Sequence, residues 1–351
     1  MIITPNYRLS KENTLALDVQ AAYYVRLGSP EDVRTLSRDE YFRTLPFITI
    51  GSGSNLLFVG DFKGAVLRYL PSEIRTLKED DTTITLQVDA GANWHDLVMD
   101  CADKGLWGIE NLALIPSEVG AAAVQNIGAY GREIKDVIRA VHYTDLRTGT
   151  DVRLPVSEIG YDYRYSIFKE PHMAYALVTA VELELSKAPT PMLEYHGLAP
   201  LQGHTDLTPR EVADFVIGIR EQKLPDPAKT PNAGSFFKNP IISTDDFDAL
   251  QKEYPNAPHY PAKDGVKVKD GVKVPAAWLI EQSGLKGARE GNVGTYPRQP
   301  LVIVNYGGAS PREIVDFSEK IQATVQEKFR IELTPEVRFV RSIELKSIDS
   351  L

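Results

Sequence analysis

The sequence predicts an α+β protein in which a strand-rich N-terminal block precedes a C-terminal domain that contains helices. Apolar residues alternate along 64–90, 137–143 and 176–185, which is the period of strands with one wet face. Two later segments, Thr208-Pro-Arg-Glu211 and Ser310-Pro-Arg-Glu313, each combine a capping hydroxyl, a first-turn proline and an acid at the third position. Its 351 residues are enough for about two or three domains.

The N-terminal block reads as strands with two helices between them. Its elements are, in order, a strand at 23–27, a helix capped by Ser29 with Pro30 in its first turn, a strand at 46–50, consecutive strands over 64–90, a helix from the Asn93 cap to Lys104 that Gly105 ends, and strands at 137–143 and 176–185.

The C-terminal part begins after the helix at 208, which ends before Pro225-Asp-Pro227, a predicted hinge. A further helix covers 275–282. Just before it, Lys263-Asp-Gly-Val-Lys-Val268 is repeated as Lys269-Asp-Gly-Val-Lys-Val274. Its Asp-Gly turns suit a hairpin, but a short duplication in a surface loop accounts for it better, and we assign it no chemistry.

Composition and charge exclude several classes of protein. No stretch approaches the roughly eighteen apolar residues of a membrane span, and residues 1–8 lack the pattern of a secretory signal, so we expect a cytoplasmic protein. A net charge of −9 without a basic stripe argues against nucleic-acid binding. The single cysteine, Cys101, has no disulfide partner and is predicted to be a packed, reduced thiol.

The segment Pro231-Asn-Ala-Gly-Ser-Phe-Phe-Lys-Asn-Pro240 is the first candidate reaction centre. Gly234 lets the backbone approach a ligand, the two phenylalanines can exclude water, and Lys238 and Asn239 place donors beside Ser235. The segment is not the Gly-x-Ser-x-Gly elbow of a hydrolase, so Ser235 need not be a nucleophile. A buried turn with a capped serine explains the same residues.

Two segments rich in small residues are candidate cofactor sites. In Gly51-Ser-Gly-Ser-Asn-Leu-Leu57, successive N–H groups can form an anion cradle that suits a diphosphate, although it matches neither the P-loop nor the dinucleotide fingerprint. The second segment, 111–131, offers a backbone on which something flat can lie. An ordinary glycine turn and a tight helix crossing are the structural alternatives.

Two arginines complete the candidates. Aromatic residues surround Arg164 in Tyr161-Asp-Tyr-Arg-Tyr165, which is typical of a surface cation–π stack and equally of a rigid guanidinium that grips a carboxylate. Glu336 and Arg338 lie two apart in an extended run and therefore on one face. Alone, that pair is most simply a surface ion pair of little energetic value.

Together these segments resemble the family of UDP-N-acetylenolpyruvoylglucosamine reductases, flavoproteins of cytoplasmic peptidoglycan precursor synthesis. The likeness runs from about Tyr23 to Phe339. Its motifs are Gly-Ser-Gly-Ser-Asn-Leu-Leu at 51–57, Ile-Pro-Ser-Glu-Val-Gly and Gln-Asn-Ile-Gly-Ala-Tyr-Gly within 115–131, Tyr-Arg-Tyr-Ser at 163–166, Gly-Ser-Phe-Phe-Lys-Asn-Pro at 234–240 and Pro-Glu-Val-Arg-Phe at 335–339. Tyr195 matches the tyrosine that closes over the nucleotide sugar in the longer subtype. The tandem hexapeptide looks like an insertion relative to the family.

The resemblance implies an FAD-binding domain of the vanillyl-alcohol-oxidase type in two subdomains, residues 1–72 with 337–351 and residues 73–207, and an α+β substrate-binding domain at 208–336. It implies a non-covalent FAD, since neither flavin segment has a cysteine or histidine where related oxidases attach theirs. The implied FAD contacts are Gly51, Ser52, Gly53, Ser54, Asn55, Leu56, Ile115, Pro116, Ser117, Gly120, Asn126, Gly128 and Arg338. The implied substrate contacts are Tyr195, Lys223 and Asn239.

The resemblance also implies a reaction. NADPH reduces bound FAD and leaves, and the flavin passes hydride to the enolpyruvyl carbon distal to the carboxylate of UDP-N-acetylglucosamine enolpyruvate. Arg164 then polarises the carboxylate, Glu336 acts as its partner, protonated or through water, and Ser235 donates the proton to the adjacent carbon. We expect no metal, and a monomer that binds neither nucleic acid nor membrane.

Two rival functions follow from the same residues. Another flavin oxidase of this fold would make peroxide in air and would not require Ser235. A nucleotide-sugar binding module without turnover would hold a UDP diphosphate in the glycine loop and no flavin, but would have no use for Arg164, Ser235 and Glu336 together.

Overall fold

The computed structural model describes residues 1–261, 271–342 and 345–350. Its N-terminal part contains a four-stranded sheet in the order β1-β2-β5-β3, in which β1 is antiparallel to β2 and the other pairs are parallel. The strands are β1 (Ile2–Arg8), β2 (Gln20–Leu27), β3 (Phe47–Ile50) and β5 (Phe62–Tyr69). Helices α1 (Pro30–Arg38), capped by Ser29 as predicted, and α2 (Glu40–Thr44) pack on one side.

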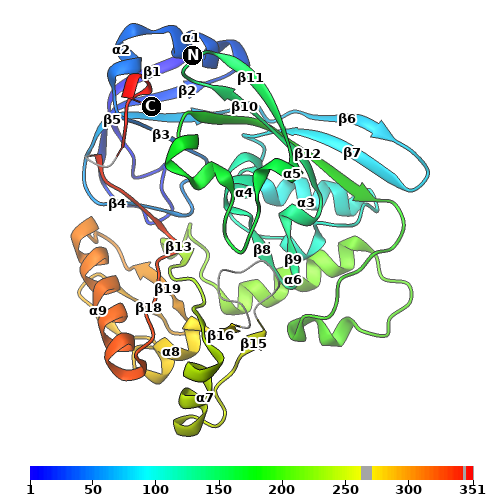
Figure 1. Ribbon diagram of the computed structural model, residues 1–351, viewed down its shortest axis with the longest axis vertical. Helices are drawn as coiled ribbons and strands as arrows, with labels where there is room; N and C mark the ends of the chain where they lie inside the picture. Colours follow the sequence, from blue (N-terminus) through cyan, green and yellow to red (C-terminus); the bar gives the residue numbers. More distant parts are fainter. Residues whose placement is uncertain (262–270, 343–344, 351) are drawn as a thin grey trace.

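A five-stranded antiparallel sheet in the order β11-β10-β12-β7-β6 follows (Figure 1). Its strands are β6 (Ile74–Glu79), β7 (Thr83–Asp89), β10 (Ile138–Asp145), β11 (Thr150–Pro155) and β12 (Ala176–Ser186), and its helices are α3 (Trp94–Asp103), α4 (Val119–Gln125), α5 (Val156–Ile159) and α6 (Pro209–Lys223). The predicted alternation of buried residues holds in β7, whereas every residue of β6 is exposed because it forms the edge. Short 3₁₀ helices, labelled η, and two short strands connect the larger elements of this sheet. They are η1 (Glu110–Leu112), β8 (Gly128–Ala129), β9 (Arg132–Glu133), η2 (Ile134–Asp136), η3 (Ile167–Lys169), η4 (Pro171–Met173) and η5 (His196–Leu201).

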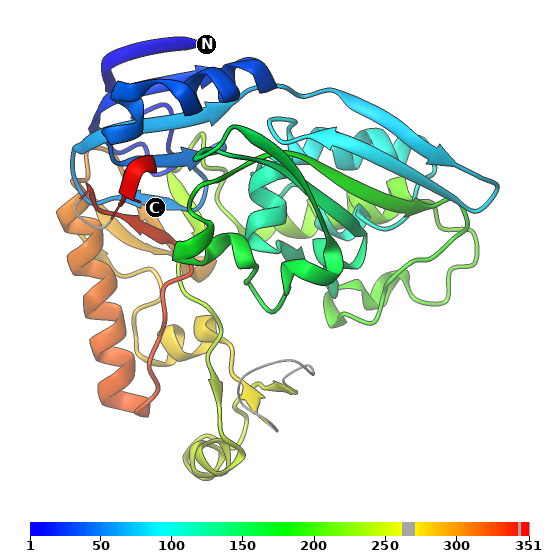
Figure 2. The ribbon, with the colours of Figure 1, turned by 45° about the horizontal axis from the view of Figure 1, so that its top comes forward.

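The C-terminal part has its own four-stranded sheet in the order β13-β19-β18-β17, with helices α8 and α9 packed on it. In Figure 2 this part lies apart from the second sheet, and α7 lies at its far end. The elements are β13 (Asn232–Ser235), β14 (Ile241–Ile242), α7 (Thr244–Glu253), β15 (Tyr260–Pro261), β16 (Val272–Lys273), α8 (Ala276–Gln282), β17 (Arg289–Glu290), β18 (Val293–Tyr296), β19 (Gln299–Asn305) and α9 (Pro311–Phe329). The last element, η7 (Ile348–Ser350), packs instead on α2 of the N-terminal part.

The chain returns to its N-terminal part at the end. Strand β20 (Arg338–Val340) pairs in parallel with β4 (Leu56–Phe58), which confirms the predicted return of residues 337–341 (Figure 1). The capping boxes at Thr208 and Ser310 are both formed. Most of the tandem hexapeptide, residues 263–270, lies outside the described residues, so the hairpin interpretation remains untested there.

Two hydrophobic cores meet at the first sheet. Val25 and Leu67 point into a core shared with the second sheet and its helices, while the neighbouring Tyr24 and Val66 point into a core shared with the C-terminal part. Parallel strands buried on both faces are typical of such a central layer. Helix α6 packs on α3 and η1, on the side of the second sheet. The domain bounds predicted above, which place α6 in the substrate domain, stay a prediction.

The thiol of Cys101 is fully buried in the first of these cores, and burial raises its pKa to about 12. A raised pKa keeps the thiol protonated, and the thiolate is the reactive form. We therefore expect native protein at pH 8 to react negligibly with a thiol-specific dye and denatured protein to react with one equivalent. Full labelling of native protein within minutes would show that Cys101 is accessible.

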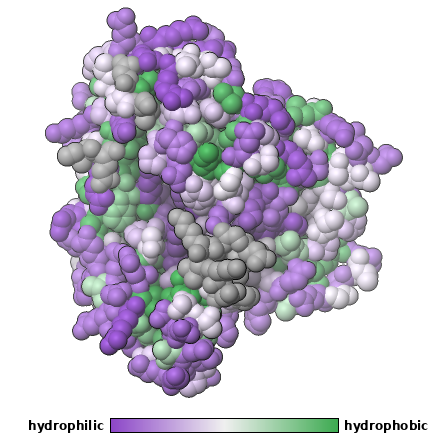
Figure 3. All heavy atoms as spheres, viewed as in Figure 1, coloured by the Kyte–Doolittle hydropathy of each residue, from purple (hydrophilic) through white to green (hydrophobic). Residues whose placement is uncertain are grey.

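Most of the surface in the view of Figure 3 is hydrophilic, with scattered hydrophobic side chains between. Within the described residues no helix is both long and apolar enough to cross a bilayer.

Candidate active site

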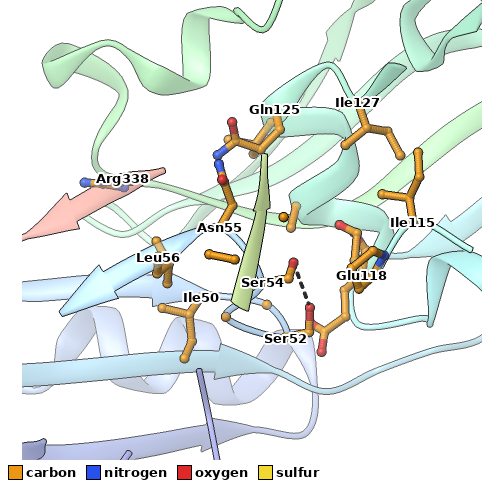
Figure 4. A pocket seen from close by; sticks show the side chains of 18 of the residues that line it. Ile50, Ser52, Ser54, Asn55, Leu56, Ile115, Glu118, Gln125, Ile127 and Arg338 are labelled. Atoms are coloured by element: carbon orange, nitrogen blue, oxygen red, sulfur yellow. Dashed lines mark hydrogen bonds between the residues drawn. The ribbon is translucent and has the colours of Figure 1, made fainter. Parts of the chain in front are cut away.

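A cavity of about 1260 Å³ lies where the three sheets approach one another, and it collects most of the predicted site residues. The volume exceeds the 300–1,000 Å³ that is usual for a drug-sized ligand, so it suits a ligand of dinucleotide size. Figure 4 shows Ser52, Ser54, Asn55 and Leu56 on one wall and Ile115 and Ile127 across from them. Residues 235 and 336 come from the C-terminal part, and residue 338 comes from β20, which has returned to the N-terminal part.

The glycine loop connects β3 to β4, and its predicted cofactor residues, 51–56, all line the cavity. Gly53 has φ +66°, and a Cβ atom there would lie 2.1 Å from the backbone oxygen of Glu12, so only glycine fits. The hydroxyls of Ser52 and Ser54 lie 3.3 Å apart and face the same space (Figure 4). The loop is thus more than an ordinary turn, since it forms a cavity wall.

The second small-residue segment serves packing and the cavity at once. A Cβ atom on Gly120 would lie 2.7 Å from that of Ala90, so the missing side chain lets α4 lie directly beside the end of β7. The outer side of the same segment faces the cavity through Ile115, Pro116, Ser117, Gly120 and Gly128, as predicted.

Asn126, the remaining residue predicted in this segment, does not line the cavity. It is fully buried with φ 45°, and its amide group donates to the Glu133 carboxylate (3.1 Å) and to the Asp162 carbonyl (2.8 Å). Its side-chain oxygen accepts from Lys135 N. In this structure Asn126 therefore ties the end of α4 to the turn that carries Arg164.

Ser235 and Glu336 lie side by side on neighbouring segments. The backbone N–H of Glu336 donates to the Phe236 carbonyl (2.8 Å), and the N–H of Lys238 donates to the Thr334 carbonyl (2.9 Å). Ser235 is exposed at the end of β13, and its hydroxyl makes no hydrogen bond within the described part of the chain. The alternative of a buried, capped serine is therefore wrong. Phe236 and Phe237 are buried and fix the segment in the C-terminal core.

Arg164 approaches Glu336 from the other side of the cavity. Its Nε atom lies 2.9 Å from Glu336 Oε1, an ion pair between side chains that are each less than one-fifth exposed. Its two terminal nitrogens donate to the carbonyls of Asn126 (3.3 Å) and Gly128 (2.7 Å). The guanidinium lies 5.5 Å from the Tyr163 ring, so the predicted aromatic contact exists as well. The partner of Glu336 is thus Arg164, rather than Arg338.

Besides Arg164 and Arg338, the described part of the cavity wall carries five basic side chains that the sequence analysis missed. Basic side chains outnumber acidic ones on its wall; they are Arg164, Lys169, Arg220, Lys229, Arg298, Arg338 and Lys346, against Glu118, Glu170, Glu221, Asp226 and Glu336. Burial lowers the pKa of Arg220 and of Arg338. Lys169 and Arg220 do not lie in glycine-rich segments, and only the fold shows that they face this cavity. His95 lines the cavity too, and its Nδ1 accepts from Leu114 N (3.1 Å).

These features fit an anionic, flat dinucleotide such as FAD. The Nε atom of Arg220 is buried and makes no hydrogen bond within the described residues, although buried donors are normally satisfied. A glycine loop whose Ser52 and Ser54 hydroxyls line the cavity belongs to the same wall, and Ile115 and Ile127 supply apolar surface. No group of three or more His, Cys, Asp or Glu side chains in the described ranges could hold a metal ion.

The three predicted substrate contacts lie outside the lining of this cavity. Tyr195 is 44% exposed and its ring meets that of Tyr130 edge-on, at 5.4 Å between centroids. Lys223 is the exposed last residue of α6, and Asn239 accepts a hydrogen bond from Ala276 N (2.9 Å) at the start of α8. Their roles remain predictions.

Comparison with known proteins agrees with this architecture. Residues 21–155 match an FAD-binding domain model, and residues 226–340 match the C-terminal domain model of UDP-N-acetylenolpyruvoylglucosamine reductase. Curated proteins of that name from Porphyromonas gingivalis and Amoebophilus asiaticus are 44% and 42% identical, and each match covers 97% of this chain and 100% of the relative. The crystal structure of UDP-N-acetylenolpyruvylglucosamine reductase from Thermus caldophilus shares the fold, with a TM-score of 0.68 at 24% identity over 97% of this chain and 100% of that chain.

These matches confirm the predicted α+β fold, with an FAD-binding domain before a separate C-terminal domain, and the family that the motifs indicated. The chain belongs to the UDP-N-acetylenolpyruvoylglucosamine reductase family and is an FAD-binding oxidoreductase.

Proposed function

We propose that this chain reduces UDP-N-acetylglucosamine enolpyruvate to UDP-N-acetylmuramate with NADPH, in the cytoplasmic synthesis of peptidoglycan precursors, as a monomer. The observation that carries the proposal is the meeting of Arg164, Glu336 and Ser235 on the wall of one cavity with the glycine loop. These residues are up to 172 positions apart by their numbers in the sequence, and an unrelated use of the cavity gives no reason for them to converge.

The cofactor is held by the predicted residues that line the cavity, namely 51–56, Ile115, Pro116, Ser117, Gly120, Gly128 and Arg338. When bound, FAD supplies the hydride chemistry that links NADPH to the enolpyruvyl group. The protein contributes the anion-binding loop, the apolar wall and the surrounding cations. In an acidic chain of net charge −9, this local excess of basic side chains gives three anionic ligands, FAD, NADPH and the UDP sugar, a favourable site.

Arg164 and Glu336 act on the substrate carboxylate. When hydride reaches the distal carbon, negative charge develops on the carboxylate, and a guanidinium that is already fixed lowers the energy of that state. The carbonyls of Asn126 and Gly128 and the carboxylate of Glu336 hold Arg164 on three sides before substrate binds. Little reorganisation is then required when the charge forms.

Ser235 completes the reaction by donating a proton to the carbon next to the carboxylate. A serine hydroxyl is a weak acid, so it acts on a strongly basic intermediate with cationic groups nearby. The position of Ser235 supports this role, since its side chain is exposed to the cavity at the end of β13. The carbonyl of the following residue, Phe236, accepts a hydrogen bond from Glu336 N, so Ser235 and Glu336 lie on adjoining segments. Lys223, Asn239 and Tyr195 are proposed to bind the nucleotide sugar when it occupies the site.

The test distinguishes this function from its two rivals. Purified protein should be yellow and should oxidise NADPH only when the enolpyruvyl substrate is added, with UDP-N-acetylmuramate as product. Rapid NADPH oxidation in air that yields peroxide without this substrate would favour a different flavin oxidase. A colourless protein that binds UDP sugars and does not take up FAD would favour a binding module.

We further propose that the flavin is bound without a covalent link. The cavity contains one histidine, His95, whose Nδ1 is engaged with Leu114 N, and Cys101 is buried away from the cavity. After denaturation, all of the yellow flavin should therefore pass through an ultrafiltration membrane that retains the protein. Fluorescence that stays with the protein band on a denaturing gel would contradict this.

A further inference from the structure

We propose that Lys169 is a positioning residue that holds Arg164, and the end of helix α4 beside it, in the arrangement that acts on the substrate carboxylate. The inference rests on the proposed function and adds to it a residue for which neither the sequence motifs nor the comparisons give a role.

Arg164 sits in a backbone conformation that needs external support. It is the third residue of a tight turn in which Tyr165 N donates to the Asp162 carbonyl (3.0 Å) and Asp162 N donates to the Tyr165 carbonyl (3.2 Å). Its φ is +54°, in the left-handed region. Glycine usually occupies this position of such turns, and other residues keep it only where their surroundings impose it. The guanidinium direction therefore depends on what fixes this turn.

Lys169 supplies that constraint with its ammonium group. Its Nζ donates to the carbonyl oxygen of Arg164 (3.1 Å) and to the side-chain oxygen of Gln125 (2.9 Å), the last residue of α4. A second bond joins the same two segments, since the Ser166 hydroxyl donates to the Val124 carbonyl of α4 (2.6 Å). Lys169 thus joins the strained turn to α4, and Arg164, Lys169 and Gln125 all line the cavity.

The positive charge of Lys169 lies close to other positive charges, which disfavour it. The Lys169 side chain is exposed and faces the cavity, yet partial desolvation by the neighbouring protein and the positive charge of Lys238 lower its pKa to about 8; Arg164 and Arg338 act in the same direction, whereas Glu336 opposes them. At pH 7 it is still an ammonium with three donors, of which the two acceptors named above use two. An uncharged side chain would fill the space without this repulsion.

The experiment compares Lys169→Met and Lys169→Arg with Lys104→Met, a control that removes an exposed lysine paired with Asp100 on α3. Each protein is reconstituted with FAD, and its FAD dissociation constant and the rates of its two half-reactions are measured anaerobically. For Lys169→Met we expect FAD affinity and reduction by NADPH to fall only slightly, since Lys169 is one of seven basic side chains that the described residues place on the wall. Oxidation by the enolpyruvyl substrate should be slowed about tenfold to a hundredfold, as for a displaced catalytic group. Lys169→Arg, which retains a charged donor, should recover most of that rate.

A double variant shows whether Lys169 acts through Arg164. In an Arg164→Lys background, Lys169→Met should cause little further loss, because the group that it positions is already gone. Full additivity would overturn the inference and assign Lys169 to the ligand directly; a Lys169→Met protein with wild-type rates, or one that loses FAD, would overturn it too. If the unmodified chain does not oxidise NADPH with the enolpyruvyl substrate at all, the proposed function fails, and the inference with it.

Discussion

Replacing Ser235 with alanine is expected to leave the reduction of bound FAD by NADPH unchanged and to slow the following oxidation by the enolpyruvyl substrate by about 10²–10⁴-fold, the usual contribution of a positioned proton donor. The substitution removes one hydroxyl that is exposed to the cavity and makes no hydrogen bond within the described residues. Stability should therefore change little. Anaerobic stopped-flow absorbance follows the two half-reactions separately on the same sample.

Ser72→Ala is the matched control, since Ser72 is exposed and lies outside the cavity. It should behave as the unmodified protein in both half-reactions. Equal losses in both half-reactions of the Ser235→Ala protein would instead indicate damaged cofactor binding, and an unchanged second half-reaction would remove Ser235 from the mechanism.

Replacing Arg164 with lysine is expected to slow the same half-reaction by about 10²–10³-fold, the typical effect of removing one preorganised charge-stabilising donor. Lysine keeps the positive charge and is as poorly suited to φ +54° as arginine, so the backbone strain is unchanged. It cannot reproduce the planar fork, which now contacts Glu336 and the carbonyls of Asn126 and Gly128 at once. The comparison therefore isolates the guanidinium geometry.

Arg312→Lys is the control for this change, because Arg312 forms an exposed pair with Asp316 on α9. Rates within about twofold of the unmodified protein are expected, since such a surface pair contributes little to stability. An Arg164→Lys protein with an unimpaired second half-reaction would mean that the ion pair with Glu336 is structural only.

Much of the fold was predictable because local signals agree with it. The capping boxes at Thr208 and Ser310 define α6 and α9 to within a residue at their starts, and alternation defines β7. Alternation alone did not show that β6 is an exposed edge or that the central sheet is buried on both sides. Those properties depend on which strand neighbours which, and this is set by contacts between distant parts of the chain.

The candidate site was predictable where its chemistry is encoded in short segments. The glycine loop and the Arg164, Ser235 and Glu336 motifs all reach one cavity. Asn126 looked like a cofactor contact because it lies in a small-residue segment, but from the end of α4 its amide donates to the Glu133 carboxylate and the Asp162 carbonyl. Conversely, Lys169 and Arg220 look like ordinary surface charges in sequence, and only the tertiary structure turns them toward the cavity.

The most direct test of the central claim is a crystal structure of the chain with FAD and the enolpyruvyl substrate bound. The account predicts that the substrate carboxylate lies within about 2.6–3.2 Å of the Arg164 guanidinium, beside Glu336, with the Ser235 hydroxyl at the same reach from the carbon next to the carboxylate and the flavin ring along the opposite side. A substrate bound with its carboxylate away from Arg164, or a flavin outside the cavity of the glycine loop, would contradict it.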